Sequence, residues 1–229
     1  MELEDNELHI WKYVVNETEN YPEKTTMTLS KMECEKYESF ICRGDAVRFM
    51  SNRVFLRKVL SFYVNSEPAD LKFEVNNFGK PKLTDSNICF NTSHRNNFLL
   101  VAVGRNKEIG IDIEQIINIA DIQAFISSYF TSTEINVILK SPKKEQLKSI
   151  FALWTLKEAF IKAIGKGLSL DLRQIEMTDY FNSIVKPVNY ENKSTPWTIR
   201  NIDVDKDYIA AFAVNQNISN LIRMFHVQD

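Results

Sequence analysis

Two acidic residues interrupt a run of isoleucines near the middle of the chain. The segment EIGIDIE, residues 108–114, alternates isoleucine with a glycine, Asp112 and Glu114. Residues i and i+2 of a β-strand point to the same face, so the isoleucines face a core and both carboxylates share the other face, with Cα atoms about 7 Å apart. This spacing predicts either a solvent-facing side of a strand or a pair of carboxylates that repel each other unless a positive group lies between them.

A second charged pattern follows about forty residues later, in LWTLKEAFIKAIGKG at 153–167. Its periodicity predicts a helix over 145–164 that ends at the glycines that follow. Glu158 and Lys162 are i,i+4 neighbours on one side of this helix, and a surface ion pair is the plain interpretation. If helix and strand meet, three carboxylates form a hard oxygen site that suits Mg²⁺ or Mn²⁺, and Lys162 can hold a phosphate oxygen. That set favours metal-assisted phosphoryl transfer, but periodicity does not show that the two segments meet.

Composition limits the classes of protein to which the chain can belong. With 229 residues, 44% of them hydrophobic and 25% charged, it has the composition of a globular protein of one large domain or two fused halves. The net charge of −2 gives no global basic field for nucleic acid. No apolar run is long enough to span a membrane and no signal-peptide core is present, so we expect a cytoplasmic protein with no membrane partner. Three cysteines without metal-site spacing are expected to be free thiols.

The elements that must position the acidic residues are a mixture of strands and helices. The predicted strands cover residues 9–15, 71–75, 87–91, 98–103, 108–114, 172–177, 197–202 and 208–214. The predicted helices cover residues 28–40, 46–64, 119–130, 135–140 and 145–164. We expect Asp45 to cap the second helix and the capping box TSTE, residues 131–134, to begin the fourth. The similar element order suggests two related α+β halves that meet near residue 105.

The two charged segments together resemble the signature of the 4'-phosphopantetheinyl transferases. They match its two elements at every defining position: Gly110, Asp112, Glu114, Trp154, Lys157, Glu158, Ala159, Lys162, Gly165, Gly167 and Leu168. The length resembles the larger, Sfp-like (surfactin-synthetase-activating) subclass. This resemblance implies an α+β monomer of two pseudo-symmetric halves, residues 1–105 and 106–229, each a small antiparallel sheet packed on a long helix, with the active site at their interface.

The first half extends the resemblance. GKP at 79–81 and FNTSH at 90–94 look like motifs of the same subclass, and Lys36 and Arg48 align with its basic segment. Taken alone, GKP is an ordinary turn and the two basic residues are ordinary exposed charges. The family commonly continues with Ser-Gly after the histidine, whereas this chain has Arg95-Asn96, so the loop there is expected to differ.

The resemblance implies a role for each group of residues. Asp112, Glu114 and Glu158 bind Mg²⁺, with Mn²⁺ as an alternative. Lys162 and Ser93 contact the pyrophosphate of coenzyme A. His94, Arg48 and Lys36 hold its 3'-phosphate. Gly79 and Lys80 lie beside its adenine.

The implied reaction moves phosphopantetheine from coenzyme A to a serine of an apo acyl or peptidyl carrier protein, a transient partner, and releases 3',5'-ADP. The serine needs a base, and the sequence leaves two candidates, Glu158 and a metal-bound hydroxide. A different Mg²⁺-dependent phosphoryl-transfer or nuclease-type enzyme and a non-enzymatic coenzyme A or carrier-binding module also stay open. No P-loop or GxGxxG motif occurs, which argues against common nucleotide-binding folds.

Overall fold

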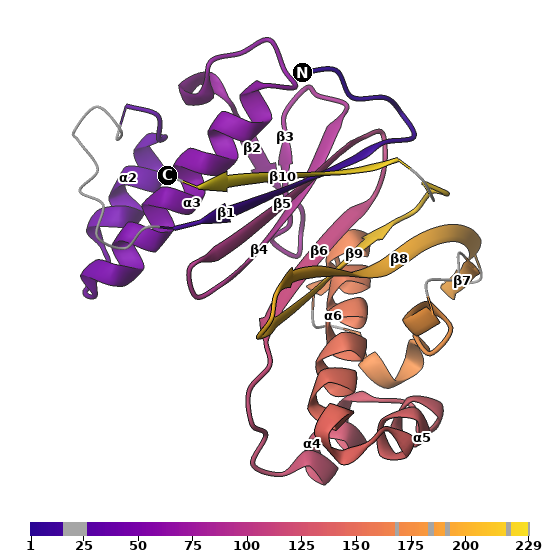
Figure 1. Cartoon of the computed structure of the whole chain (residues 1–229). Helices are drawn as coiled ribbons and strands as arrows, with labels where there is room; N and C mark the ends of the chain where they lie inside the picture. The colour runs from indigo at the N-terminus through magenta and orange to yellow at the C-terminus, as the bar shows by residue number, and fades with distance from the viewer. Residues whose placement is uncertain (16–26, 168–169, 183–185, 191–192, 219–220, 229) are drawn as a thin grey trace.

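The chain forms two four-stranded sheets, each packed against one long helix, and a small two-stranded hairpin (Figure 1). The computed structural model describes residues 1–15, 27–167, 170–182, 186–190, 193–218 and 221–228. The helices are α2 (Lys31–Glu38), α3 (Arg43–Ser61), α4 (Ile122–Tyr129), α5 (Ser132–Lys140) and α6 (Gln146–Ile164). The strands are β1 (Leu8–Val14), β2 (Phe73–Val75), β3 (Pro81–Leu83), β4 (Ile88–Arg95), β5 (Phe98–Arg105), β6 (Ile109–Gln115), β7 (Lys186–Tyr190), β8 (Lys193–Asp205), β9 (Tyr208–Val214) and β10 (Ile222–Gln228). The predicted α+β class is confirmed.

The first sheet has the order β10-β1-β5-β4. β1, β5 and β4 pair antiparallel, whereas β10 comes back from the end of the chain and pairs parallel with β1. Figure 1 shows this last strand beside the first one, with both chain ends in the same lobe. Leucines and valines of α3 pack on this sheet in a buried core that includes Leu60, Leu99 and Val101.

The second sheet is antiparallel, with the order β6-β9-β8-β7. The buried face of α6 packs on it, with Leu156 and Phe160 against Ile199 and Ala211. The isoleucines of β6 point to the opposite side and pack against Leu100 and Ala102 of β5 in a third core. The prediction that these isoleucines share a buried face is therefore confirmed, and this core joins the two sheets.

Local signals at most helix ends act as the sequence predicts. Thr131 and Glu134 form the predicted capping box of α5. The left-handed residue Gly165, at φ 70°, ends α6. The three cysteines are free. In the described part of the chain no helix has the length and apolar character needed to cross a membrane.

Two local predictions are wrong. Asp45 does not cap α3, because Cys42 occupies the N-cap position without a side-chain bond and Asp45, one turn inside, pairs with Arg48. Residues 172–177 do not form a strand, because Leu172–Gln174 make a short 3₁₀ turn that Asp171 caps. The carbonyl oxygens of Leu172 and Ile175, which a strand would pair with another strand, accept hydrogen bonds from a buried lysine of α6 instead.

Candidate active site

Strand β6 lies at the junction of the two sheets. One edge of β6 pairs with β9. At the other edge, side chains of β4 accept hydrogen bonds from its backbone: the N–H of Ile111 donates to Asn91 Oδ1 at 2.9 Å and the N–H of Ile113 to Ser93 Oγ at 3.3 Å. Asn91 and Ser93 both belong to the FNTSH segment. That segment therefore joins the first half to the strand that carries the acidic pair.

Gly110 allows β6 to lie directly on the backbone of α6. A Cβ atom at this position would lie 1.8 Å from Ala159 O and 2.5 Å from Ala163 N, so any side chain would push the strand off the helix. Periodicity left open whether the strand and the helix meet. In the structure β6 and α6 are in direct contact, and this close approach places Asp112 beside Lys162.

Asp112 lies at the centre of the site and only 4% of its surface is exposed. Its Oδ1 accepts hydrogen bonds from Lys162 Nζ at 2.7 Å and from Ser93 Oγ at 3.0 Å. Lys162 Nζ also donates to Ser93 Oγ at 2.9 Å. The second oxygen, Oδ2, is buried and has no hydrogen-bond partner among the described residues. A buried, unpartnered carboxylate oxygen is costly, so Oδ2 is a candidate atom for contact with a ligand or cation.

The other two carboxylates share this electrostatic environment. Glu158 Oε1 is also buried without a hydrogen-bond partner among the described residues. Burial, followed by the negative charge of Asp112, raises the pKa of Glu158 to about 7, although Lys162 opposes the shift. Burial and Asp112 likewise raise the pKa of Glu114, and the positive charge of Arg95 and a hydrogen bond from Trp154 oppose this rise. We call Asp112, Glu114 and Glu158 the acid set.

The acid set suits a divalent cation by its chemistry. All three groups are carboxylates, and two of them keep a buried oxygen free of hydrogen bonds. Among the residues that the structure describes, no three acidic, histidine or cysteine side chains already stand grouped as a metal site. Lys162 contacts Asp112, and Arg95 Nε lies 3.4 Å from Glu114 Oε2. As they stand, the three carboxylates are not grouped as a metal site, so binding of one ion by the whole acid set would require their side chains to change conformation.

A pocket of about 480 Å³, which we call the anion pocket, includes His94, the residue that follows Ser93 on β4. Arg48, Arg53 and His94 line it together with Asp45, which pairs with Arg48, and Phe40 and Phe49 give it an aromatic wall. The surrounding protein desolvates the His94 ring and lowers its pKa, and the positive charges of Lys162, Arg48 and Arg53 lower it further. The pocket is therefore suited to a phosphorylated ligand with a flat ring.

The remaining sequence-predicted residues do not line this pocket themselves. Lys36 is exposed on α2, with Nζ 5.2 Å from the centroid of the Phe40 ring. Gly79 is in the β2–β3 turn at φ 85°, and Pro81 lines the anion pocket. The ammonium of Lys80 points elsewhere: it lines another pocket, beside the end of α6, and hydrogen-bonds to main-chain oxygens. Leu168 lies outside the described residues.

The departure from the family pattern after His94 has a physical explanation. Asn96 adopts a left-handed conformation, φ 50°, in the tight turn between β4 and β5, and asparagine tolerates this conformation better than most non-glycine residues. Its Nδ2 donates to Gln115 and to the hydroxyl of Tyr208. Asn96 therefore keeps the turn that a glycine would allow, and Arg95 adds a positive charge beside Glu114.

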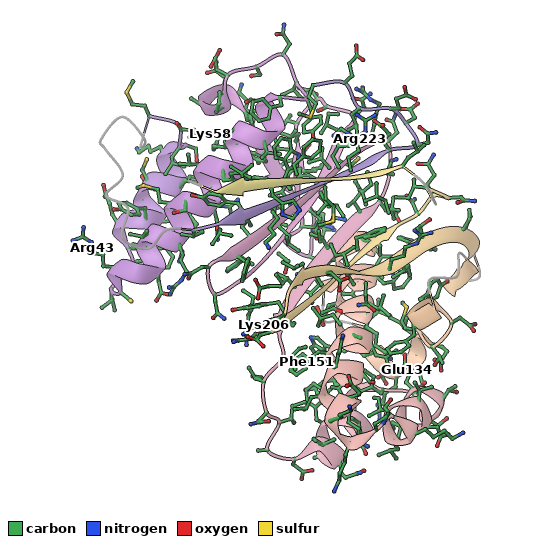
Figure 2. All side chains as sticks on the ribbon, in the orientation of Figure 1. Arg43, Lys58, Glu134, Phe151, Lys206 and Arg223 are labelled. Atoms are coloured by element: carbon green, nitrogen blue, oxygen red, sulfur yellow. The ribbon has the colours of Figure 1, made fainter. Side chains whose placement is uncertain are left out.

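Sequence reasoning gave no role to the buried pair Lys157–Glu134. Both side chains are fully buried, and Lys157 Nζ lies 2.6 Å from Glu134 Oε2. The same ammonium donates to the carbonyl oxygens of Leu172 and Ile175, each at 2.8 Å. Figure 2 shows Glu134 among the helices of the second half. Lys157 was identified only as a motif position and Glu134 only as part of a capping box. Arg53, in the anion pocket, was missed as well, and no signal in the sequence distinguishes it from other helix arginines.

Comparisons with known proteins show the family to which the chain belongs. A family model described as the 4'-phosphopantetheinyl transferase superfamily matches residues 108–213, and one described as the N-terminal part of 4'-phosphopantetheinyl transferase matches residues 16–106. The chain is 30% identical over 216 residues to 4'-phosphopantetheinyl transferase HetI of Nostoc sp., covering 93% of this chain and 89% of that protein. It is 32% identical to ffp of Bacillus subtilis over 190 residues, covering 81% and 83%. It is 31% identical to Sfp of Bacillus subtilis strain 168 over 181 residues, covering 79% of each chain.

Proposed function

Because the chain belongs to the 4'-phosphopantetheinyl transferase superfamily, we propose that it transfers the 4'-phosphopantetheine group of coenzyme A to a serine of an apo acyl or peptidyl carrier protein and releases 3',5'-ADP. The single observation that carries this proposal for this chain is the acid set, in which two buried carboxylate oxygens lack partners beside a cationic pocket. Such a pair of sites suits a ligand that carries several phosphates.

The anion pocket would hold the nucleotide end of coenzyme A. Arg48 and His94 line the pocket and would contact the 3'-phosphate, with Lys36 approaching from α2. The backbone of Gly79 and Lys80 would flank the adenine, because the next residue, Pro81, lines the same pocket. This assignment uses only the main chain of Lys80.

Asp112, Glu114 and Glu158 would hold Mg²⁺, with Mn²⁺ as the alternative ion. When bound there, the ion neutralises charge on the pyrophosphate. Lys162 and Ser93, which hydrogen-bond to each other and to Asp112, would turn toward pyrophosphate oxygens. Lys162 then stabilises the negative charge that develops on the leaving phosphate.

The chemical step exchanges one phosphorus–oxygen bond for another. The hydroxyl oxygen of the carrier serine attacks the phosphorus nearest to pantetheine, and the bond from that phosphorus to 3',5'-ADP breaks. The serine proton passes to a base, for which we propose the Glu158 carboxylate, because its Oε1 is buried in the site and free of other hydrogen bonds.

We also propose that the protein works as a cytoplasmic monomer, with no nucleic-acid or membrane partner, and that it binds its carrier transiently. In this proposal the site lies between a first half, residues 1–105, and a second half, residues 106–229. Hydrogen bonds from Ile111 and Ile113 of β6 to side chains of β4 support a site at that boundary. β10 is a departure from a simple division, since it adds to the first sheet.

The test is intact-mass analysis of a panel of apo carrier proteins incubated with the protein, coenzyme A and Mg²⁺. We expect a carrier to gain the mass of phosphopantetheine and 3',5'-ADP to appear in equal amount. Lys162→Ala should lower turnover about tenfold, because charge stabilisation at the leaving phosphate is lost. Binding of coenzyme A with no change in any carrier mass would instead indicate a non-enzymatic binding module, and an unchanged rate would exclude Lys162 from the mechanism.

A further inference from the structure

The side chain of Lys80 crosses from the first half of the chain into the second. From the β2–β3 hairpin, its Nζ donates to Ile109 O at 2.9 Å and to Ala163 O at 2.7 Å. One ammonium therefore bonds the beginning of β6 and the end of α6 at once. Ile109 lies three residues before Asp112, and Ala163 directly follows Lys162.

A neighbouring asparagine strengthens this contact. Asn76 Nδ2 donates to Gly165 O at 2.9 Å, so the hairpin satisfies two carbonyl oxygens at the end of α6. Asn76 Oδ1 accepts hydrogen bonds from the backbone N–H groups of Phe78 and Lys80, which fixes the turn. A Cβ atom at Gly165 would lie 2.9 Å from Asn76 Nδ2 and 3.0 Å from Lys80 Cδ. The fit between the hairpin and the helix end is therefore tight.

The charge environment of Lys80 agrees with a partly buried ammonium bonded to main-chain oxygens. Burial lowers the pKa of Lys80 to about 8, and only the more distant charges of Glu108 and Cys89 oppose this shift. A positive group at the C-terminal end of a helix is favourable, since the last carbonyl oxygens carry partial negative charge. No carboxylate in the described part of the chain pairs with Lys80 at ion-pair distance. Its partners at the end of α6 are main-chain oxygens.

We propose that Lys80 is a positioning residue: by tying the β2–β3 hairpin to Ile109 and Ala163, it sets the spacing between the strand and the helix that carry the acid set. This inference rests on the proposed transferase function and deepens it. It separates two roles of the GKP segment, because the backbone faces the nucleotide while the lysine side chain acts on the geometry of the catalytic groups.

The experiment compares Lys80→Met with a matched control, Lys82→Met. Lys82 is on the same hairpin, but its ammonium is exposed and pairs with Glu74 at 3.1 Å, so this variant removes a positive charge without touching β6 or α6. Three quantities are measured for each protein well below its melting temperature. They are kcat for carrier loading, KM for coenzyme A, and the Kd for 3',5'-ADP without metal or carrier.

We expect Lys80→Met to lower kcat about tenfold while the Kd for 3',5'-ADP stays within twofold of the wild-type value, and Lys82→Met to change neither. A rise in the Kd for 3',5'-ADP and in KM with an unchanged kcat would overturn the proposal, because the side chain would then contact the nucleotide. A lower melting temperature with unchanged kinetics would also overturn it, since the role would be structural only.

A structural readout separates failure of this proposal from failure of the proposed function. If the wild-type protein loads no carrier, the transferase function is wrong. Amide hydrogen exchange at residues 110–113 and 162–165 then still tests whether Lys80 holds β6 and the end of α6 in place. Faster exchange at both segments in Lys80→Met, and not in Lys82→Met, supports it; exchange equal to wild type at both segments contradicts it.

Discussion

Lys157 and Glu158 are neighbours on α6, yet their surroundings are opposite. Lys157 is fully buried, pairs with Glu134 and donates to three carbonyl oxygens, while Glu134 accepts two backbone N–H groups, from Thr131 and Met177. Glu158 and Asp112, on the other side of the helix, each keep a buried oxygen with no hydrogen-bond partner among the described residues. One helical motif therefore contains a lysine whose hydrogen bonds are complete, Lys157, and a glutamate with a buried oxygen that has no such bond, Glu158.

This difference separates structural charge from functional charge. Buried ionic groups are tolerated when hydrogen bonds and an opposite charge compensate their desolvation, as at Lys157. Groups that stay uncompensated in a folded protein lower its stability, and they persist where a ligand supplies the missing partner. Because Lys157 and Glu158 lie on one helix, substitutions at each contact can test directly which charge is structural and which is functional.

The largest effect on stability is expected from Glu134→Ala, which leaves the Lys157 ammonium buried without its counter-charge. We expect a loss of about 3–5 kcal/mol in the free energy of unfolding, measured by urea denaturation. The matched control is the double variant Glu134→Leu with Lys157→Met, which replaces the pair by apolar groups and should recover part of the loss. A loss below about 1 kcal/mol for Glu134→Ala would show that the pair is not structural.

Glu158→Gln should have the opposite profile. It should lower carrier loading at least a hundredfold, about 3 kcal/mol at 1.4 kcal/mol per tenfold, because the metal and proton chemistry is lost. The free energy of unfolding should stay the same or increase, since a buried and uncompensated charge is removed. Asp112→Asn should lower carrier loading to a similar extent, but no gain in stability is expected, because this variant also breaks the ion pair with Lys162. Normal loading of a carrier by either variant, followed by intact mass, would exclude the metal-site assignment.

Lys80 differs from both, because it is only partly buried and its partners are main-chain oxygens. Its pKa in the folded protein is about 8, below the ordinary value of 10.5 in the unfolded chain. Between these two values the unfolded chain binds more protons, so stability should rise with pH in this window and be independent of this group below it. Relative to Lys80→Met, the wild type should gain roughly 1–2 kcal/mol between pH 8 and pH 9.5. Parallel curves of unfolding free energy against pH for the two proteins would contradict the low pKa.

The smallest effect concerns Arg95, the positive charge that lies 3.4 Å from Glu114. Arg95→Ser should improve the affinity of the acid set for a divalent ion about two- to threefold, because a half-exposed ion pair that competes with the ion is removed. Direct titration with Mn²⁺, followed by its paramagnetic signal in the absence of coenzyme A, measures this affinity. Weaker Mn²⁺ binding by the variant would mean that Arg95 supports the acid set instead of competing with the ion.

The sequence was sufficient for the features that depend on local spacing. The alternation in β6, the capping box at Thr131 and the end of α6 at Gly165 all follow from short-range rules, and the structure confirms them. It was insufficient where a distant side chain decides the outcome. The segment 172–177 has a strand-like pattern, but the carbonyl oxygens of Leu172 and Ile175 accept hydrogen bonds from Lys157 of α6. The motif includes Lys80 and predicts it beside the adenine, and only the fold shows that its ammonium contacts Ile109 O and Ala163 O.

The parallel pairing of β10 with β1 has a consequence for synthesis on the ribosome. β1 can pair with β5 early, but its other neighbour, residues 222–228, emerges only after the whole second sheet has been made. One edge of the first sheet therefore stays open while residues 106–221, about half of the chain, are made. A nascent chain halted near residue 105 would expose that edge, so we expect it to need a holding chaperone that the finished protein does not.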